Sequence, residues 1–220
     1  MVSGPAILDL RGTLPTPSEL APVADHLRSG GLLAYPTETV YGFGGLCTPT
    51  EVERLRSLKR RAEDRPLLVL VRDAHAAAGL RWSDEARELA SIFWPGALTL
   101  VLADPERIFP EGVRSADGGV AVRMSPHPLV AALLELLPTP LTSTSANAPG
   151  EAPARSGQEA LHAAVTLGAG TEMLVLDGGH LPPSGPSTIV DCTGAAPVVI
   201  REGTLPLSRL RCALPALHAR

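Results

Sequence analysis

The chain has 220 residues, 45% hydrophobic and 19% charged, with a formal net charge of −4. This length and composition predict one soluble domain, or at most one and a half, and the negative charge excludes attraction of nucleic acid by the mean field of the molecule. Three widely spaced cysteines without a C-x-x-C pair argue against a disulfide framework or a zinc site. With no secretory signal and no run of about 18 apolar residues, we expect a cytoplasmic protein and no membrane partner.

The first third of the chain predicts two helices and a buried strand. Ser18 is expected to cap a helix to about Ser29, and residues 32–35 form an apolar strand before Pro36. A capping-box pattern at residues 50–53 starts a second helix. The basic residues 59–61 then fall in its last turn, where cations suit the helix dipole.

Strands and helices alternate through the rest of the chain. The expected strands cover residues 67–71, 98–102, 120–123, 141–144, 174–176, 188–191 and 198–201, and the expected helices cover residues 84–93, 129–137 and 158–167. This alternation predicts an α/β fold, and the last three strands, close together without helices, predict a mixed sheet. Residues 204–220 are expected to form a C-terminal tail after one domain over residues 1–203, with a core at about 18–203.

Lys59 is the only lysine among 19 basic residues, and it lies in a run from Arg54 to Arg61 that contains no acid. An ammonium is a point charge and a guanidinium is a planar fork, so the two meet oxygen ligands differently. The single lysine therefore indicates a site that needs a point charge. Alternatively, compositional drift toward arginine could have left one lysine that has no function.

Three polar segments follow or precede expected strands, where open α/β sheets place ligands. They are residues 36–45, 142–147 and 185–191, the last with Arg201-Glu202-Gly203 after it. The glycine spacing of the first fits neither a P-loop nor a Rossmann turn, and no Gly-x-Ser-x-Gly elbow surrounds the serines of the second.

The charged residues and the spacing of possible metal ligands limit the kinds of reaction that the site could catalyse. Arg123 and Arg201 end apolar strands, so each needs an anion or a carboxylate partner. The six histidines have no metal-ligand spacing, so no protein-built metal site is expected. Cations and hydroxyls without an evident nucleophile are typical of phosphoryl or nucleotidyl transfer, where positioning and charge neutralisation dominate.

Taken in order, the motifs resemble the YrdC-like family of threonylcarbamoyl-AMP synthases, over about residues 18–203. The motifs are Pro-Thr-Glu-Thr-Val-Tyr-Gly at 36–42, Lys-x-Arg at 59–61, Arg-Pro-Leu at 65–67, Trp-Pro-Gly at 94–96, Arg123 with His127-Pro128, Ser-Ala-Asn at 145–147, Ser-Thr-Ile-Val-Asp at 187–191 and Arg-Glu-Gly at 201–203. The resemblance implies an open twisted mixed sheet around a basic concave cavity, in the short, single-domain form of the family.

The resemblance also implies the reaction and the site. A nucleotidyltransferase would join L-threonine, bicarbonate or CO2 and ATP into threonylcarbamoyl-AMP and pyrophosphate, with Mg²⁺ arriving on ATP, and downstream proteins would transfer the threonylcarbamoyl group to tRNA. Lys59 and Arg61 would be catalytic. The implied L-threonine ligands are Thr39, Arg123, Ser143 and Ser187, and the implied ATP ligands are Lys59, Arg61, Arg65, Ser145, Asn147 and Arg201.

Two other functions remain open at this point. Carbamoyl transfer by a similar module occurs in hydrogenase maturation proteins, but their acylphosphatase and zinc-finger segments are absent from this sequence. A non-catalytic RNA-binding or ribosome-associated factor, with weak RNA binding through the basic run, is the alternative of a different class. The acidic pI of about 5.9 and the 3% aromatic content argue against it.

Overall fold

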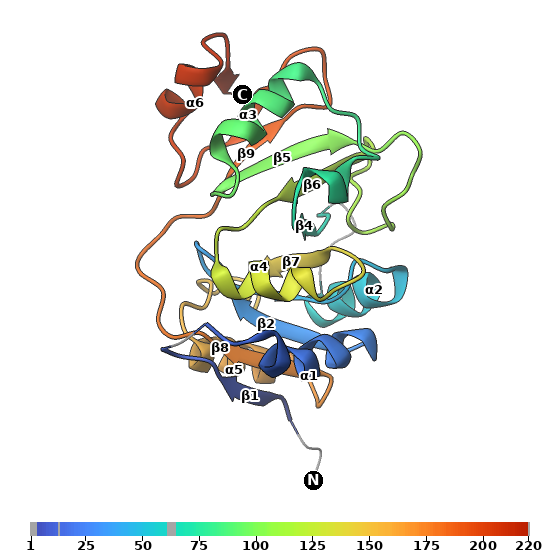
Figure 1. Cartoon of the computed structure of the whole chain (residues 1–220), viewed down its shortest axis with the longest axis vertical. Helices are drawn as coiled ribbons and strands as arrows, with labels where there is room; N and C mark the ends of the chain where they lie inside the picture. Colours follow the sequence, from blue (N-terminus) through green and yellow to red (C-terminus); the bar gives the residue numbers. More distant parts are fainter. Residues whose placement is uncertain (1–3, 13, 61–64, 220) are drawn as a thin grey trace.

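The computed structural model describes residues 4–12, 14–60 and 65–219 (Figure 1). Its helices are α1 (Pro17–Arg28), α2 (Pro49–Leu58), the 3-10 helix η1 (Ala74–Ala77), α3 (Asp84–Phe93), α4 (Pro128–Glu135), α5 (Gly157–Thr166) and α6 (Leu207–Ala213). Its strands are β1 (Ala6–Asp9), β2 (Leu32–Pro36), β3 (Tyr41–Gly44), β4 (Leu68–Leu70), β5 (Leu98–Ala103), β6 (Gly119–Arg123), β7 (Leu141–Ser145), β8 (Met173–Asp177), β9 (Thr188–Asp191), β10 (Val198–Arg201) and β11 (His218–Ala219).

The strands of the described residues form one mixed sheet of 11 strands, in the order β1-β8-β2-β3-β7-β4-β6-β5-β9-β10-β11. Pairs such as β1–β8 and β4–β6 are parallel, whereas β7 is antiparallel to both of its neighbours, β3 and β4. In Figure 1 strand β1 lies at one end of the molecule and helix α6 lies at the other. The open mixed α/β fold predicted from the sequence is confirmed.

Both faces of the sheet carry apolar side chains because strand residues alternate between faces. In β2, Leu33 and Tyr35 belong to a cluster with the buried residues of α1 and α4, whereas Leu32 and Ala34 belong to a larger cluster. That larger cluster also contains buried residues of α2, α3, α5 and α6. Helices therefore cover β2 on both sides, which explains why the strand reads as a continuous apolar run.

The starts of α1 and α2 differ from the sequence prediction. Thr16, not Ser18, caps α1, and it forms a capping box in which Glu19 Oε2 accepts the Thr16 backbone N–H at 2.8 Å. The N-cap of α2 is Thr48, so the capping box predicted at residues 50–53 is wrong. Pro at the first helical position shifts each start toward the N-terminus, because its fixed φ suits the first turn.

The end of α2 also differs from the prediction. The helix ends at Leu58, so Lys59 is the C-cap rather than part of the last turn, and Arg60 follows with φ 47°. A residue in the left-handed region ends a helix by turning the chain away from its axis. Lys59 consequently leaves the helix and reaches toward the end of β7.

Residues 41–44 form strand β3, although their glycines suggest a turn. A Cβ added to Gly44 would lie 2.0 Å from the carbonyl oxygen of Thr142, and one added to Gly42 would lie 2.9 Å from Ser143 Oγ. Glycine is depleted in strands but is required where two backbones approach this closely. These glycines therefore bring β3 against β7.

The segment after Gly203, which the sequence analysis expects as a tail, folds onto the sheet. Leu210 of α6 and Leu217 are buried, and β11 pairs in parallel with β10. The apolar positions of this segment are few and spaced by polar residues, so its sequence gives little sign that it packs. The domain boundary at residue 203 stays a prediction.

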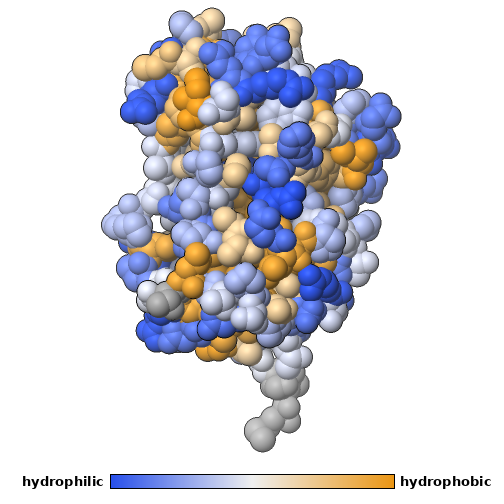
Figure 2. Space-filling view, in the orientation of Figure 1, coloured by the Kyte–Doolittle hydropathy of each residue, from blue (hydrophilic) through white to orange (hydrophobic). Residues whose placement is uncertain are grey.

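On the face shown in Figure 2, hydrophilic and hydrophobic atoms are interspersed over short distances. The large apolar side chains with substantial exposure come from separate parts of the sequence: Ile7, Leu14, Ile92, Ile108, Val165 and Ile200. Scattered exposure of this kind is ordinary for folded chains. None of the helices in the described ranges combines the length and the apolarity needed to span a bilayer.

Candidate functional site

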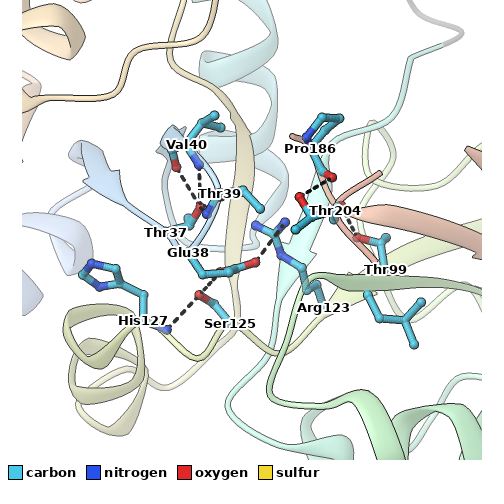
Figure 3. A network of polar contacts seen from close by, with 12 residues as sticks. Thr37, Glu38, Thr39, Val40, Thr99, Arg123, Ser125, His127, Pro186 and Thr204 are labelled. Atoms are coloured by element: carbon cyan, nitrogen blue, oxygen red, sulfur yellow. Dashed lines mark hydrogen bonds and ion pairs between the residues drawn. The ribbon is translucent and has the colours of Figure 1, made fainter. Parts of the chain in front are cut away.

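Arg123 ends β6 and is turned into the protein rather than toward solvent. Its side chain is only 5% exposed, and its Nη1 lies 3.5 Å from Glu38 Oε1 in the turn between β2 and β3 (Figure 3). Burial lowers the pKa of Arg123, and the negative charge of Glu38 opposes that shift. The strand that precedes Arg123 is apolar and packs inside the protein, so the guanidinium at its end also lies in the interior.

Arg201 is held by Ser187, and the charge of Arg123 acts on it. The Nε and Nη2 atoms of Arg201 donate to the Ser187 backbone oxygen at 3.1 and 2.8 Å, and Nη2 also lies 3.2 Å from Ser187 Oγ. Ser187 Oγ is in turn 2.9 Å from Thr99 Oγ1. Burial lowers the pKa of Arg201, and the charge of Arg123 lowers it further. Two guanidinium groups whose charges act on each other favour a bound anion.

Ser143 and Thr39 belong to the same part of the molecule. Burial raises the pKa of Tyr35 to about 12, and Ser143 and Arg123 both lower it, which places both near this phenol. Thr39 is buried in the turn that carries Glu38, with its Oγ1 at 3.0 Å from Thr37 Oγ1. The four residues predicted to hold L-threonine thus come from the β2–β3 turn, β6, β7 and the start of β9.

Lys59 forms a second polar cluster with the segment after β7. It is 8% exposed, and its Nζ donates to the backbone oxygens of Ser145 and Asn147 and to Asn147 Oδ1, with the first and third distances at 2.9 and 3.0 Å. The Ser145 hydroxyl donates to the same Oδ1 at 2.6 Å. Three oxygens around one nitrogen suit an ammonium and not a planar fork, which gives a physical reason for the single lysine.

The remaining predicted ATP ligands are less well placed. Arg61 lies outside the described residues. Arg65 is exposed just before β4. The structure brings Lys59, Ser145 and Asn147 together at the end of β7, and separately brings Ser187 and Arg201 together. Strand β4 lies in the sheet between β7 and β6, the strand that ends with Arg123.

One of two cavities lies apart from these clusters, and the other touches the Lys59 cluster. One of about 1000 Å³, between α2 and the loop after β5, is lined by Arg56, Arg107 and Arg114 together with Glu53, Asp104 and Glu111, and by no predicted site residue. The other, of about 350 Å³, includes Asn147 and lies against α5. Its lining combines four alanines with polar side chains such as Glu151, Glu159 and His162.

Glu38, Ser125 and Thr99 are not among the site residues predicted from the sequence. Ser125 Oγ donates to Glu38 Oε2 and accepts the His127 backbone N–H at 3.2 Å. Only the position of Glu38 in the sequence could have suggested a functional role. It lies in the Pro-Thr-Glu-Thr motif, in a polar turn after a buried strand. Nothing in the spacing indicates that it meets Arg123, 85 residues later.

Comparison with known proteins assigns the chain to a family. The Sua5_yciO_yrdC family model, described as "Telomere recombination", matches residues 25–203. A threonylcarbamoyl-AMP synthase of Pyrococcus abyssi is 36% identical over 190 residues, which are 85% of this chain and 54% of that protein. One of Bacillus subtilis is 33% identical over 204 residues, 91% of this chain and 58% of that protein. The chain thus spans little more than half the length of these relatives.

A solved structure has the same fold. The crystal structure of P. abyssi Sua5 complexed with L-threonine superposes with a TM-score of 0.88 at 31% identity, and the match covers 97% of this chain and 62% of that one. Identity at this level over nearly the whole chain accompanies the ordered motifs and the open mixed sheet. The chain belongs to the Sua5/YciO/YrdC family.

Proposed function

We propose that this protein is an L-threonylcarbamoyladenylate synthase, a nucleotidyltransferase that condenses L-threonine, bicarbonate or CO2 and ATP to threonylcarbamoyl-AMP and pyrophosphate. The observation that carries the proposal is the hydrogen bonding of Arg201 to Ser187, together with the charge of Arg123, which helps to lower the pKa of Arg201. Paired cations beside hydroxyls suit a substrate carboxylate and a polyphosphate. The names of the relatives in Pyrococcus and Bacillus agree with this chemistry.

In this proposal Arg123, Thr39, Ser143 and Ser187 bind L-threonine. A guanidinium grips a carboxylate through two parallel N–H donors, and hydroxyls orient the remaining polar groups. Burial of all four residues strengthens these contacts because the surrounding dielectric is low.

The second cluster would bind ATP. Arg61, Arg65, Ser145, Asn147 and Arg201 are the proposed ligands, with Lys59 and Arg61 as catalytic residues. Since the Lys59 ammonium donates to oxygens of the Ser145–Asn147 segment, its charge acts close to phosphates that this segment would bind. The described residues contain no group of three or more His, Cys, Asp or Glu fit to hold a metal, so Mg²⁺ would be bound by the ATP phosphate oxygens themselves.

Formation of threonylcarbamoyl-AMP then requires alignment of the two substrates more than it requires a general base. A carboxylate oxygen of N-carboxylated threonine bonds to the α-phosphorus, and the bond from that phosphorus to the bridging oxygen breaks, so that pyrophosphate leaves with the electron pair. Cations that neutralise the developing charge lower this barrier. Holding both reactants in one site removes most of the entropic cost of their meeting.

Because threonylcarbamoyl-AMP is labile, we expect the synthase to work near the proteins that use this product. We place the reaction in the cytoplasm, with the product passed to proteins that modify adenosine in tRNA, and we propose residues 1–203 as the catalytic domain. Hydrolysis of an acyl adenylate in water makes rapid transfer to such proteins necessary.

Pyrophosphate release by the purified protein tests the proposal. Release from ATP and Mg²⁺ should require both L-threonine and bicarbonate, and leaving out either should reduce it to background. No release under any combination, together with RNA binding that falls steeply with salt, would instead support the RNA-binding alternative.

A further inference from the structure

The turn between β2 and β3 fixes the direction of Glu38. Thr37 Oγ1 accepts the backbone N–H groups of Thr39 and Val40 at 3.2 and 3.3 Å and donates to the Val40 oxygen at 2.7 Å. A threonine that bonds its own turn in this way holds the turn in one conformation. In Figure 3 the Glu38 side chain extends from this turn toward Ser125 and Arg123.

The ion pair between Glu38 and Arg123 is incomplete. Their closest atoms, Oε1 and Nη1, are 3.5 Å apart, and the two side chains are 16% and 5% exposed. Glu38 Oε2 accepts from Ser125, but Glu38 Oε1 and Arg123 Nε are both buried without a hydrogen-bond partner among the described residues. Buried polar atoms are almost always hydrogen-bonded, so one missing donor and one missing acceptor at one place point to a ligand that supplies both.

An α-amino acid has that pair of groups. Its ammonium provides three donors, and its carboxylate, attached to the same carbon, provides the acceptors. Near Arg123 and Arg201 a cationic group would be repelled unless a carboxylate faced it, and Glu38 is the carboxylate paired with Arg123 in the described chain.

We propose that Glu38 determines specificity for an α-amino acid by accepting a hydrogen bond from the substrate ammonium at Oε1, while Arg123 binds the substrate carboxylate. Ser125 holds the other Glu38 oxygen and so keeps Oε1 turned to the substrate. The inference rests on the proposed function in taking the substrate to be L-threonine, and its test requires no turnover.

The experiment is calorimetric titration of the full chain with L-threonine and with (R)-3-hydroxybutanoate, which keeps the carboxylate and hydroxyl but lacks the ammonium. The wild-type chain should bind L-threonine about 10- to 100-fold more tightly, the range expected for one charge-assisted hydrogen bond. Equal affinity for the two ligands would overturn the proposal without any variant.

Variants sharpen the same test. Glu38→Gln should weaken L-threonine binding about 10- to 100-fold and leave the affinity for (R)-3-hydroxybutanoate within about twofold. Loss of both ligands in equal measure would overturn the proposal, because Glu38 would then only position Arg123. The control is Glu135→Gln, an exposed glutamate 3.8 Å from Arg72, which should match the wild type with both ligands.

The outcome is separable from that of the proposed reaction. Binding of L-threonine that depends on Glu38, without pyrophosphate release, would reject the synthase and keep the ammonium contact. Pyrophosphate release that requires L-threonine but is unchanged in Glu38→Gln, in KM as well as in kcat, would reject the ammonium contact and keep the synthase.

Discussion

Among the residues that the structure describes, two arginine–carboxylate pairs that face inward differ in how completely their atoms are hydrogen-bonded. Asp104, whose side chain is 0% exposed, accepts the backbone N–H groups of Ile108 and Phe109 at 3.0 Å each. Its partner Arg114, 3.7 Å away, donates to the Phe109 oxygen at 2.9 Å. Both Asp104 oxygens are thus used within one loop.

The pair of Arg123 and Glu38 joins distant parts of the chain and leaves Nε and Oε1 without hydrogen bonds among the described residues. A pair that is satisfied within its own loop maintains that loop, whereas a pair with unused donors and acceptors is available to a ligand. Loss of the first should therefore reduce stability, and loss of the second should reduce binding and catalysis.

Arg123→Lys should have the largest effect on activity. It keeps the charge but removes the fork that binds a carboxylate through two parallel donors. We expect pyrophosphate release, measured as kcat/KM for L-threonine, to fall on the order of 100- to 1000-fold, with the melting temperature nearly unchanged. Activity within fivefold of the wild type would place the carboxylate elsewhere.

Asp104→Ala should have the largest effect on stability. It leaves Arg114 without its buried partner and two backbone N–H groups without acceptors, so urea unfolding should show a loss of about 3–5 kcal/mol. For a chain of this length that is a fall of about 10 °C in melting temperature. Asp25→Ala, which breaks the exposed pair with Arg28, is the control and should cost less than about 1 kcal/mol. A loss that small for Asp104→Ala would contradict the comparison.

Lys59→Arg tests whether the second cluster needs an ammonium. A guanidinium cannot meet the three oxygens that Nζ meets, so the Ser145–Asn147 segment should lose its position. We expect pyrophosphate release to fall about 10- to 100-fold with ATP as the varied substrate. Arg60→Lys, at an exposed neighbour, is the matched control and should keep wild-type activity. Wild-type activity in Lys59→Arg as well would show that the cluster needs only a positive charge and no ammonium.

The smallest expected effect is a difference in chemical labelling between buried and exposed cysteines. Burial raises the pKa of Cys47 to about 12, and burial with the charges of Asp191 and Glu85 does the same for Cys192, so at pH 8 roughly one thiol in 10,000 would be ionised. Iodoacetamide should therefore label exposed Cys212 in the native protein and all three cysteines in urea, as counted by mass spectrometry. Native labelling of Cys47 would show that its surroundings open.

The sequence predicts the interior of this fold better than its edges and junctions. Strands such as β2 and β5 are found because their apolar runs bury both faces, and α3 because its apolar positions repeat with helical period. By contrast, β3 is hidden by the glycines that let it approach β7, and β11 by its length of two residues.

Within the candidate site, the sequence identifies residue types but not their partners. Arg123 is recognisable as a charge at the end of an apolar strand. The sequence does not reveal that Arg123 pairs with Glu38, because this pairing depends on how strands far apart in the sequence meet. Nor does it reveal that Lys59 points to backbone oxygens, because every residue type has the same backbone oxygen.

The position of β7 has a mechanical consequence. This strand is hydrogen-bonded to β3 on one side and to β4 on the other, so it is the seam between the two halves of the sheet, and neither half can detach without exposing an unpaired edge. The Glu38–Arg123 contact joins the same two halves, because Glu38 follows β2 and Arg123 ends β6. The molecule should accordingly melt as one cooperative unit, and a ligand seated across the seam should raise the temperature at which both halves are lost together.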